Sequence, residues 1–132
     1  MGIFDFLKNK PRRFIEEANH RRNLEQQREM TPQIVSQLRL YDVTADSRLR
    51  LEYFFYTDTA EKAAALARRL SLLGYSAETG RSGYDEKIRV ITGWTNPLEM
   101  SAIEVLDWVE RMCHLGFEFD CEFDGWGTNP DQ

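Results

Sequence analysis

Alternation of apolar and polar residues in two segments, 48–56 and 117–124, constrains the fold of this chain more than any other feature. Successive side chains of a strand point to opposite faces, so each segment predicts a strand with one buried face. The second alternates without exception, with Phe117, Phe119, Cys121 and Phe123 opposing Glu118, Asp120, Glu122 and Asp124.

Two helices and two shorter strands are expected between these segments. Asp58-Thr-Ala-Glu61 has the spacing of a capping box, and apolar residues follow at helical period as far as Gly74. Asn96-Pro97 opens a second helix that Gly116 closes. The shorter strands are expected at 75–79 and 87–92.

The order strand, helix, strand, strand, helix, strand predicts an α+β, ferredoxin-like βαββαβ fold. It consists of a four-stranded antiparallel sheet with two helices on one face. The last strand should lie at an edge beside the first, and the first beside the third. We expect this domain to span residues 42–132.

Residues 1–41 are expected to form an N-terminal helical extension. A polar helix over 12–29 precedes Thr31-Pro32, which has the pattern of an N-cap and first helical residue for a helix to residue 40. The alternative is one long helix kinked at Pro32. The first ten residues predict a short amphipathic turn that contacts a surface or a partner.

Size and charge limit the class of protein. The 132 residues suffice for one domain, and no apolar run is long enough to span a membrane. No leader pattern precedes a cleavage site, so we expect a soluble, cytoplasmic protein. The net charge of −5 divides into +3 over residues 1–40 and −8 over the rest. This asymmetry points to a charged contact, external or internal.

The acidic residues of the last strand are the first candidate site. They would project from one face at intervals of about 7 Å. They could meet a basic partner or hold a hard cation, or they could form a solvated edge strand that resists edge-to-edge pairing. A calcium-loop pattern over 120–131 conflicts with the extended strand, so we expect no metal.

Aromatic residues form the second candidate site. Trp126, between Gly125 and Gly127, either plugs the core or anchors a partner, and Trp94 poses the same question. Phe54 and Tyr56 lie on the open sheet face, where the acidic charge disfavours direct RNA binding. The candidate partner-binding residues are therefore Glu118, Asp120, Glu122, Asp124, Gly125, Trp126, Gly127, Trp94, Phe54 and Tyr56.

Catalytic patterns are weak. Cys113 and His114 are consecutive helix residues that point about 100° apart, so they do not form a dyad. Cys113 and Cys121 fit buried thiols, and His20 and His114 lack metal-ligand spacing. We expect no enzyme and no cofactor.

The segment 112–128, which contains Phe-Asp-Gly-Trp-Gly-Thr, resembles the family of the bacterial regulator of ribonuclease E activity B, RraB. Tyr56-Thr-Asp58, Leu73-Gly-Tyr75 and Gln27-Arg28-Glu29 extend the resemblance over residues 24–128. It implies a ferredoxin-like fold and a non-catalytic protein that binds the RNA-degrading endonuclease and lowers its activity. The enterobacterial regulators have an acidic N-terminal helix, whereas this one is net basic.

Two functions follow as hypotheses. In the first, the protein is a regulator that binds a basic segment of a protein such as ribonuclease E through its acidic sheet edge and the Trp126 turn. In the second, it is a structural or oligomerising module whose basic N-terminal helix docks on the acidic body of its own or a second subunit.

Overall fold

The computed structural model describes residues 13–132. The amphipathic turn expected in the first ten residues lies outside this part. The described chain is a mixed α+β structure with three helices and antiparallel sheets. Its elements are α2 (Glu17–Arg39), β1 (Arg48–Leu49), β2 (Leu51–Thr57), α3 (Ala60–Leu72), β3 (Glu78–Arg81), β4 (Arg89–Trp94), β5 (Leu98–Glu99), α4 (Ala102–Glu118) and β6 (Glu122–Thr128).

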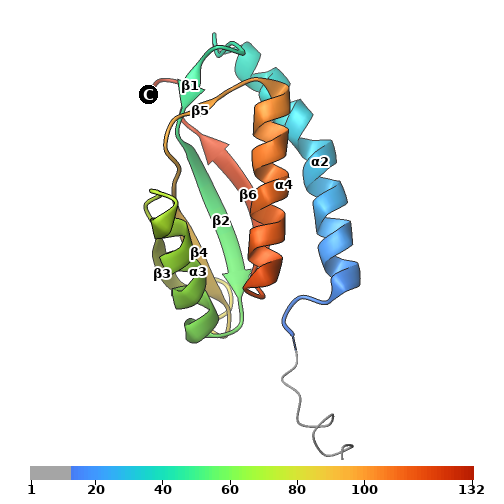
Figure 1. Ribbon diagram of the computed structural model, residues 1–132, viewed down its shortest axis with the longest axis vertical. Helices are drawn as coiled ribbons and strands as arrows, with labels where there is room; N and C mark the ends of the chain where they lie inside the picture. The colour runs from blue at the N-terminus through green and yellow to red at the C-terminus, as the bar shows by residue number, and fades with distance from the viewer. Residues whose placement is uncertain (1–12) are drawn as a thin grey trace, which may run out of the picture.

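The larger sheet has four antiparallel strands in the order β3-β4-β2-β6. The first long strand, β2, thus lies between β4 and β6, and β6 is at an edge (Figure 1). Strands β1 and β5 pair separately as a two-stranded sheet. The expectation that all strands belong to one sheet is therefore wrong. Strands β3 and β4 also lie a few residues later than predicted.

Alternation in β2 divides the sheet into two faces. Leu51, Tyr53 and Phe55 are buried, as predicted, and face the side on which α3 and α4 lie (Figure 1). Phe54 and Tyr56 are half-buried and point to the opposite face. One face of β2 therefore supports the core, and the other forms a surface that none of the three described helices covers.

Helix α2 is continuous through Pro32, so the predicted break at Thr31 is wrong and the single long helix is confirmed. Thr31 is buried within the helix, and its Oγ1 donates to the carbonyl of Gln27 at 2.7 Å. Proline inside a helix costs about 3 kcal/mol. Burial of the apolar stripe, to which Val35 and Leu38 belong, offsets this cost.

Helix α2 packs along α4 and covers the outer edge of β6. Asn23 Nδ2 donates to the carbonyl of Phe123 at 2.9 Å, and Gln27 Nε2 donates to the carbonyl of Asp124 at 3.2 Å. These contacts satisfy edge carbonyls of β6 and protect the edge from pairing with another chain. Leu24 of α2 belongs to the same core as the sheet and the other helices. The division of the chain into an extension that ends at residue 41 and a separate domain stays a prediction.

Helix α3 ends where the sequence predicts but begins one residue later. The predicted cap at Asp58 is wrong: Thr59 is the N-cap, and its hydroxyl accepts from the Lys62 N–H at 3.2 Å. The Asp58 carboxylate instead accepts from Lys62 Nζ at 2.8 Å. At the other end, Gly74 has φ +87° in a Schellman motif, in which the N–H of Tyr75 bonds back to the helix.

Helix α4 differs from the prediction at its beginning. Residues 96–100 are not helical, because Leu98 and Glu99 pair with β1. Ser101 is the N-cap, and its hydroxyl accepts from the Glu104 N–H at 3.2 Å. The Asn96-Pro97 pattern therefore precedes a strand rather than a helix.

The end of α4 is the largest correction. Gly116 does not close the helix: the Schellman motif lies four residues later, with Asp120 in the left-handed position at φ +58°. The N–H of Cys121 bonds to the Gly116 carbonyl at 2.7 Å, and that of Asp120 to the Phe117 carbonyl at 3.1 Å. A Cβ at position 116 would lie 2.5 Å from the carbonyl oxygen of Cys121. Gly116 is needed for this close return of the chain, and the predicted strand 117–124 is wrong as far as residue 121.

Candidate functional site

The predicted row of four carboxylates does not exist as a row. Glu118 is the last residue of α4, and Asp120 lies in the turn that follows. Glu122 and Asp124 alone lie on β6. The alternation of residues 117–124 therefore crosses two elements and a turn.

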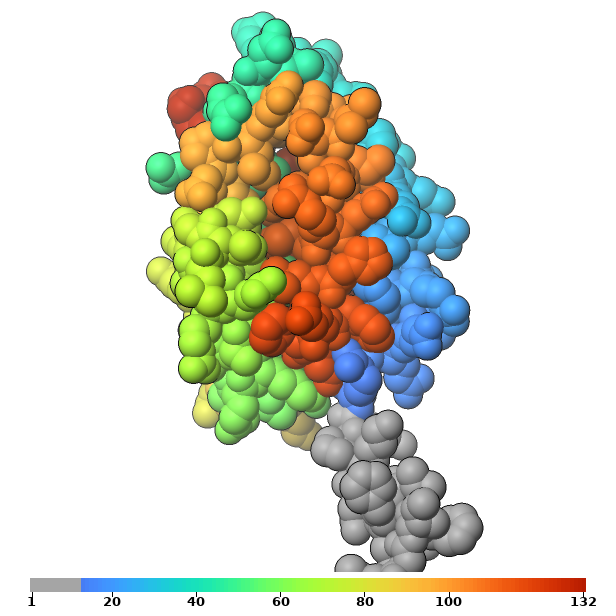
Figure 2. Space-filling model, in the orientation of Figure 1, coloured from blue at the N-terminus to red at the C-terminus, as the bar shows by residue number. Residues whose placement is uncertain are grey.

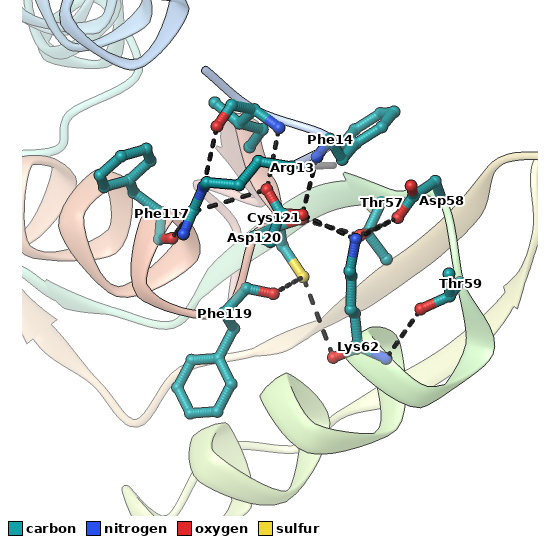
Figure 3. Close-up of polar contacts among 11 residues, drawn as sticks. Arg13, Phe14, Thr57, Asp58, Thr59, Lys62, Phe117, Phe119, Asp120 and Cys121 are labelled. Atoms are coloured by element: carbon teal, nitrogen blue, oxygen red, sulfur yellow. Dashed lines mark hydrogen bonds and ion pairs between the residues drawn. The ribbon is translucent and has the colours of Figure 1, made fainter. Parts of the chain in front are cut away.

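The carboxylate of Asp120 is held by hydrogen bonds and ion pairs within the protein (Figure 3). It is 7% exposed, and its carboxylate accepts from the N–H groups of Phe14 at 2.7 Å and Ile15 at 2.8 Å. Lys62 Nζ of α3 donates to it at 2.7 Å, and Arg13 forms an ion pair at 3.5 Å. One carboxylate therefore joins the residues before α2, the first turn of α3 and the end of α4.

The same contacts keep Asp120 ionised. Burial would raise the pKa of its carboxyl, but the hydrogen bonds from Lys62, Ile15 and Phe14 outweigh burial and hold the pKa below its usual value. Arg13 adds a further link, because its guanidinium donates to the Phe117 carbonyl and lies 4.4 Å from the centre of that ring. Asp120 is fully engaged inside the molecule, which does not fit a contact with an external partner.

The uncovered face of the four-stranded sheet brings the other candidates together; we call it the open face. Strand register places Phe54 between Thr92 of β4 and Gly125 of β6, and Tyr56 between Val90 and Glu122. In the same way, Glu52 lies between Trp94 and Gly127, and Thr92 is opposite Glu78 of β3. The predicted positions of Phe54 and Tyr56 are confirmed.

The strands supply four carboxylates and no lysine or arginine to the open face: Glu52, Glu78, Glu122 and Asp124. None of the four forms an ion pair within residues 13–132. Burial, followed by repulsion from Asp124, raises the pKa of Glu122. Burial and Asp124 also raise the pKa of Tyr56. The strands therefore give the open face a local excess of negative charge, which favours a bound cation.

Two glycines leave the β6 side of the open face without protruding side chains. A Cβ at Gly125 or Gly127 would meet no atom within 4 Å, so the space above both is open. Gly125 has φ +143°, next to a bulge opposite Phe54 and Phe55. The half-buried ring of Phe54 therefore borders a strip of bare backbone.

The two tryptophans divide between core and surface. Trp126 is 9% exposed and packs edge-on against Trp108, with ring centroids 6.4 Å apart. It plugs the core, so the interpretation of Trp126 as an exposed anchor is wrong. Trp94 is 36% exposed on the open face and stays a candidate contact.

A comparison with protein families supplies independent evidence. Residues 28–128 match the family model described as regulator of ribonuclease activity B, RraB. The chain belongs to the RraB family. The match begins within α2 and includes every strand of the open face. A comparison with curated proteins gives no match.

Burial governs the two thiols of this RraB chain and outweighs the nearby groups that lower their pKa, Arg28 beside Cys113 and Thr57 and Lys62 beside Cys121. Burial raises the pKa of Cys113 to about 12 and that of Cys121 to about 11. His114 is exposed and packs edge-on to His20, with ring centroids 5.2 Å apart. Within residues 13–132, no cluster of three or more His, Cys, Asp or Glu residues could hold a metal ion. In the same residues, no helix is long and apolar enough to cross a membrane.

The candidate partner-binding residues predicted from the sequence did not include Glu52 or Glu78, which both lie on the open face. Glu52 shares the parity of Phe54 and Tyr56 in the alternating segment, so the signal was present. Glu78 lies on a strand of four exposed residues, and only its register with Thr92 reveals its face.

Proposed function

We propose that this RraB chain is a non-catalytic, cytoplasmic regulator that binds a basic segment of a ribonuclease of the ribonuclease E type and lowers its activity. The open face supports this proposal most directly, because aromatic rings lie on it together with carboxylates that form no ion pair within residues 13–132. We also assign the four strands with α3 and α4 to the ferredoxin-like arrangement, to which β1, β5 and α2 are added.

The chemistry of the open face suits arginine or lysine side chains. A guanidinium or ammonium group over an aromatic ring gains about 0.5–2 kcal/mol, depending on how far it is desolvated. Phe54, Tyr56 and Trp94 offer rings, and Glu122 and Asp124 offer acceptors beside them. A bound cation would also relieve the repulsion between these two carboxylates.

The same charge disfavours RNA itself as the ligand. Phosphates would approach a face with four carboxylates, on a part of the chain whose charge is −8. That charge would instead speed the association with a basic protein segment, and the effect would fall as salt screens it.

Calorimetry of the full chain with a ribonuclease E type enzyme tests the proposal. We expect binding that weakens as salt rises, and an Asp124→Lys variant that binds about tenfold more weakly, equivalent to about 1.4 kcal/mol. Glu29→Lys is the matched control, because Glu29 is an exposed carboxylate on α2 and does not belong to the strands of the open face. Equal effects of the two variants, or binding that is independent of salt, would refute the proposal.

A second candidate is the structural or oligomerising module. The ion pairs Arg28–Glu110 at 2.8 Å and Arg13–Asp120 at 3.5 Å support it, because they dock the basic segment on the acidic body of the same chain. Light scattering of the full chain over a wide concentration range separates the alternatives. A stable dimer would favour an oligomerising module, whereas a monomer at all concentrations would exclude it and leave docking of the basic segment on its own chain.

A further inference from the structure

The other face of the molecule has an apolar groove between α3 and α4. Helix α4 packs along α2 on one side, and on the other a groove of about 330 Å³ separates it from α3. Figure 2 is turned to this face, with α3 in green at the left and α4 in orange at the centre. The groove is distinct from the open face, because the sheet lies between the two.

Apolar and aromatic side chains line the groove. Trp108 and Met112 are buried at its base, and the Trp108 indole N–H donates to the Tyr75 hydroxyl at 3.3 Å. Leu115 is half-buried, and Leu73 is 45% exposed at the border. A partner that covered this surface would gain about 25 cal/mol for each Å² of apolar area removed from water.

The walls of the groove are basic. Arg69 of α3 and Arg111 of α4 both line it. Arg69 forms no ion pair within residues 13–132, and Arg111 pairs only with Asp107, at 3.1 Å, where both side chains are more than half exposed. An exposed ion pair of this kind contributes little to stability, so both guanidinium groups are free to donate hydrogen bonds to the carboxylates of a partner. Glu118 lies two helical turns, about 10 Å, beyond Arg111 and marks the acidic end of the groove.

We propose that this groove binds an acidic amphipathic segment of a partner protein, with apolar side chains on Tyr75 and Leu115 and carboxylates on Arg69 and Arg111. The charge preference is opposite to that of the open face, which suits a basic segment. The protein could therefore hold two segments of opposite charge at once, one on each side of its sheet. The groove proposal does not rest on the proposed ribonuclease function, so either can fail without the other.

The test is a nuclear magnetic resonance titration of the full ¹⁵N-labelled chain with three synthetic peptides of equal length. The first combines leucine and phenylalanine with glutamate, the second replaces each glutamate with lysine, and the third replaces each apolar residue with alanine. We expect the first alone to bind, with shifts confined to the groove residues of α3, α4 and Tyr75.

Charge reversal then tests the basic walls. Arg69→Glu and Arg111→Glu should each weaken binding of the first peptide about tenfold, because each removes one charge-assisted contact. Arg68→Glu is the matched control, because Arg68 is exposed on α3 but does not line the groove. It should change the affinity less than twofold.

Four results would overturn the proposal, of which three come from the peptides and variants. They are equal binding of the lysine peptide, shifts on the open face instead of the groove, and loss of affinity in Arg68→Glu that matches the loss in Arg69→Glu. Binding of decanoate in the groove without binding of the first peptide would also overturn it, because the site would then recognise a fatty acid.

Discussion

Replacing Asp120 with Asn should lower the free energy of unfolding by about 2–3 kcal/mol. Asn keeps the size of the side chain and tolerates the left-handed backbone, so the change isolates the charge. One amide oxygen can still accept, but the amide nitrogen must face a donor, either Lys62 or a backbone N–H of Phe14 or Ile15. A buried donor left unpaired costs about 1–3 kcal/mol.

The loss of the negative charge in Asp120→Asn lowers the free energy of unfolding by less than the burial of the carboxylate suggests. Lys62 is 28% exposed and Arg13 is 46% exposed, so water screens both cations when the carboxylate becomes neutral. We expect at most about 1 kcal/mol from this source. For a domain of this size, the total corresponds to a fall in melting temperature of roughly 6–12 °C.

Urea unfolding at several pH values measures the effect. The pKa of the Asp120 carboxyl is lower in the folded state than in the unfolded state, so its contribution is present above about pH 4 and is lost as the pH falls through the folded-state pKa. The difference between the wild type and Asp120→Asn should therefore be constant near neutral pH and shrink in acid.

Asp124→Asn provides the control, because Asp124 is exposed on β6 and forms no ion pair within residues 13–132. Its stability should stay within about 0.5 kcal/mol of the wild type. If Asp120→Asn were as stable as the wild type, or if both variants lost the same stability, the role of Asp120 as the link between three elements would be refuted.

Three further predictions follow from buried groups. Gly116→Ala should lose about 1–3 kcal/mol in urea unfolding from steric overlap, whereas Gly127→Ala, with open space above it, should change little; equal losses would contradict this reasoning. Burial and nearby positive charge lower the pKa of His20, so the free energy of unfolding should fall as the pH drops below about 6.5. The difference in this free energy between the wild type and His20→Gln should shrink over the same pH range, and a constant difference would exclude His20 as the cause. Because burial raises the pKa of Cys113 and Cys121, iodoacetamide should label neither at pH 8 before unfolding, and rapid native labelling seen by mass spectrometry would disprove their enclosure.

Local periodicity predicted β2 and the position of α3 because both elements obey a pattern that a few consecutive residues define. The alternation of β2 also separated the core face from the open face, so Phe54 and Tyr56 were assigned to the correct side. Pairing between distant segments has no such local signal. The ladder between β1 and β5 involves two residues on each strand, which is too short for a period to appear.

The error at the end of α4 has a specific physical cause. Glycine is the usual residue at the left-handed position after a helix, so Gly116 predicts the end of α4. The structure instead uses glycine for a close approach to Cys121 and places Asp120 in the left-handed position. Asp is enriched at positive φ, but the stabilising contacts come from Phe14, Ile15 and Lys62, more than fifty residues away in the chain. No pattern near residue 120 could have revealed them.

This correction also changes the meaning of the charge asymmetry. Arg13 and Arg28 pair with Asp120 and Glu110, so part of the basic N-terminal segment is neutralised by the acidic body of the same chain. The carboxylates of the open face form no such pairs within residues 13–132. These four carboxylates share one sheet face with aromatic rings, so this face offers a basic segment negative charge and ring surface together. The fold thus turns part of the charge imbalance along the sequence into a cluster of carboxylates on one sheet face.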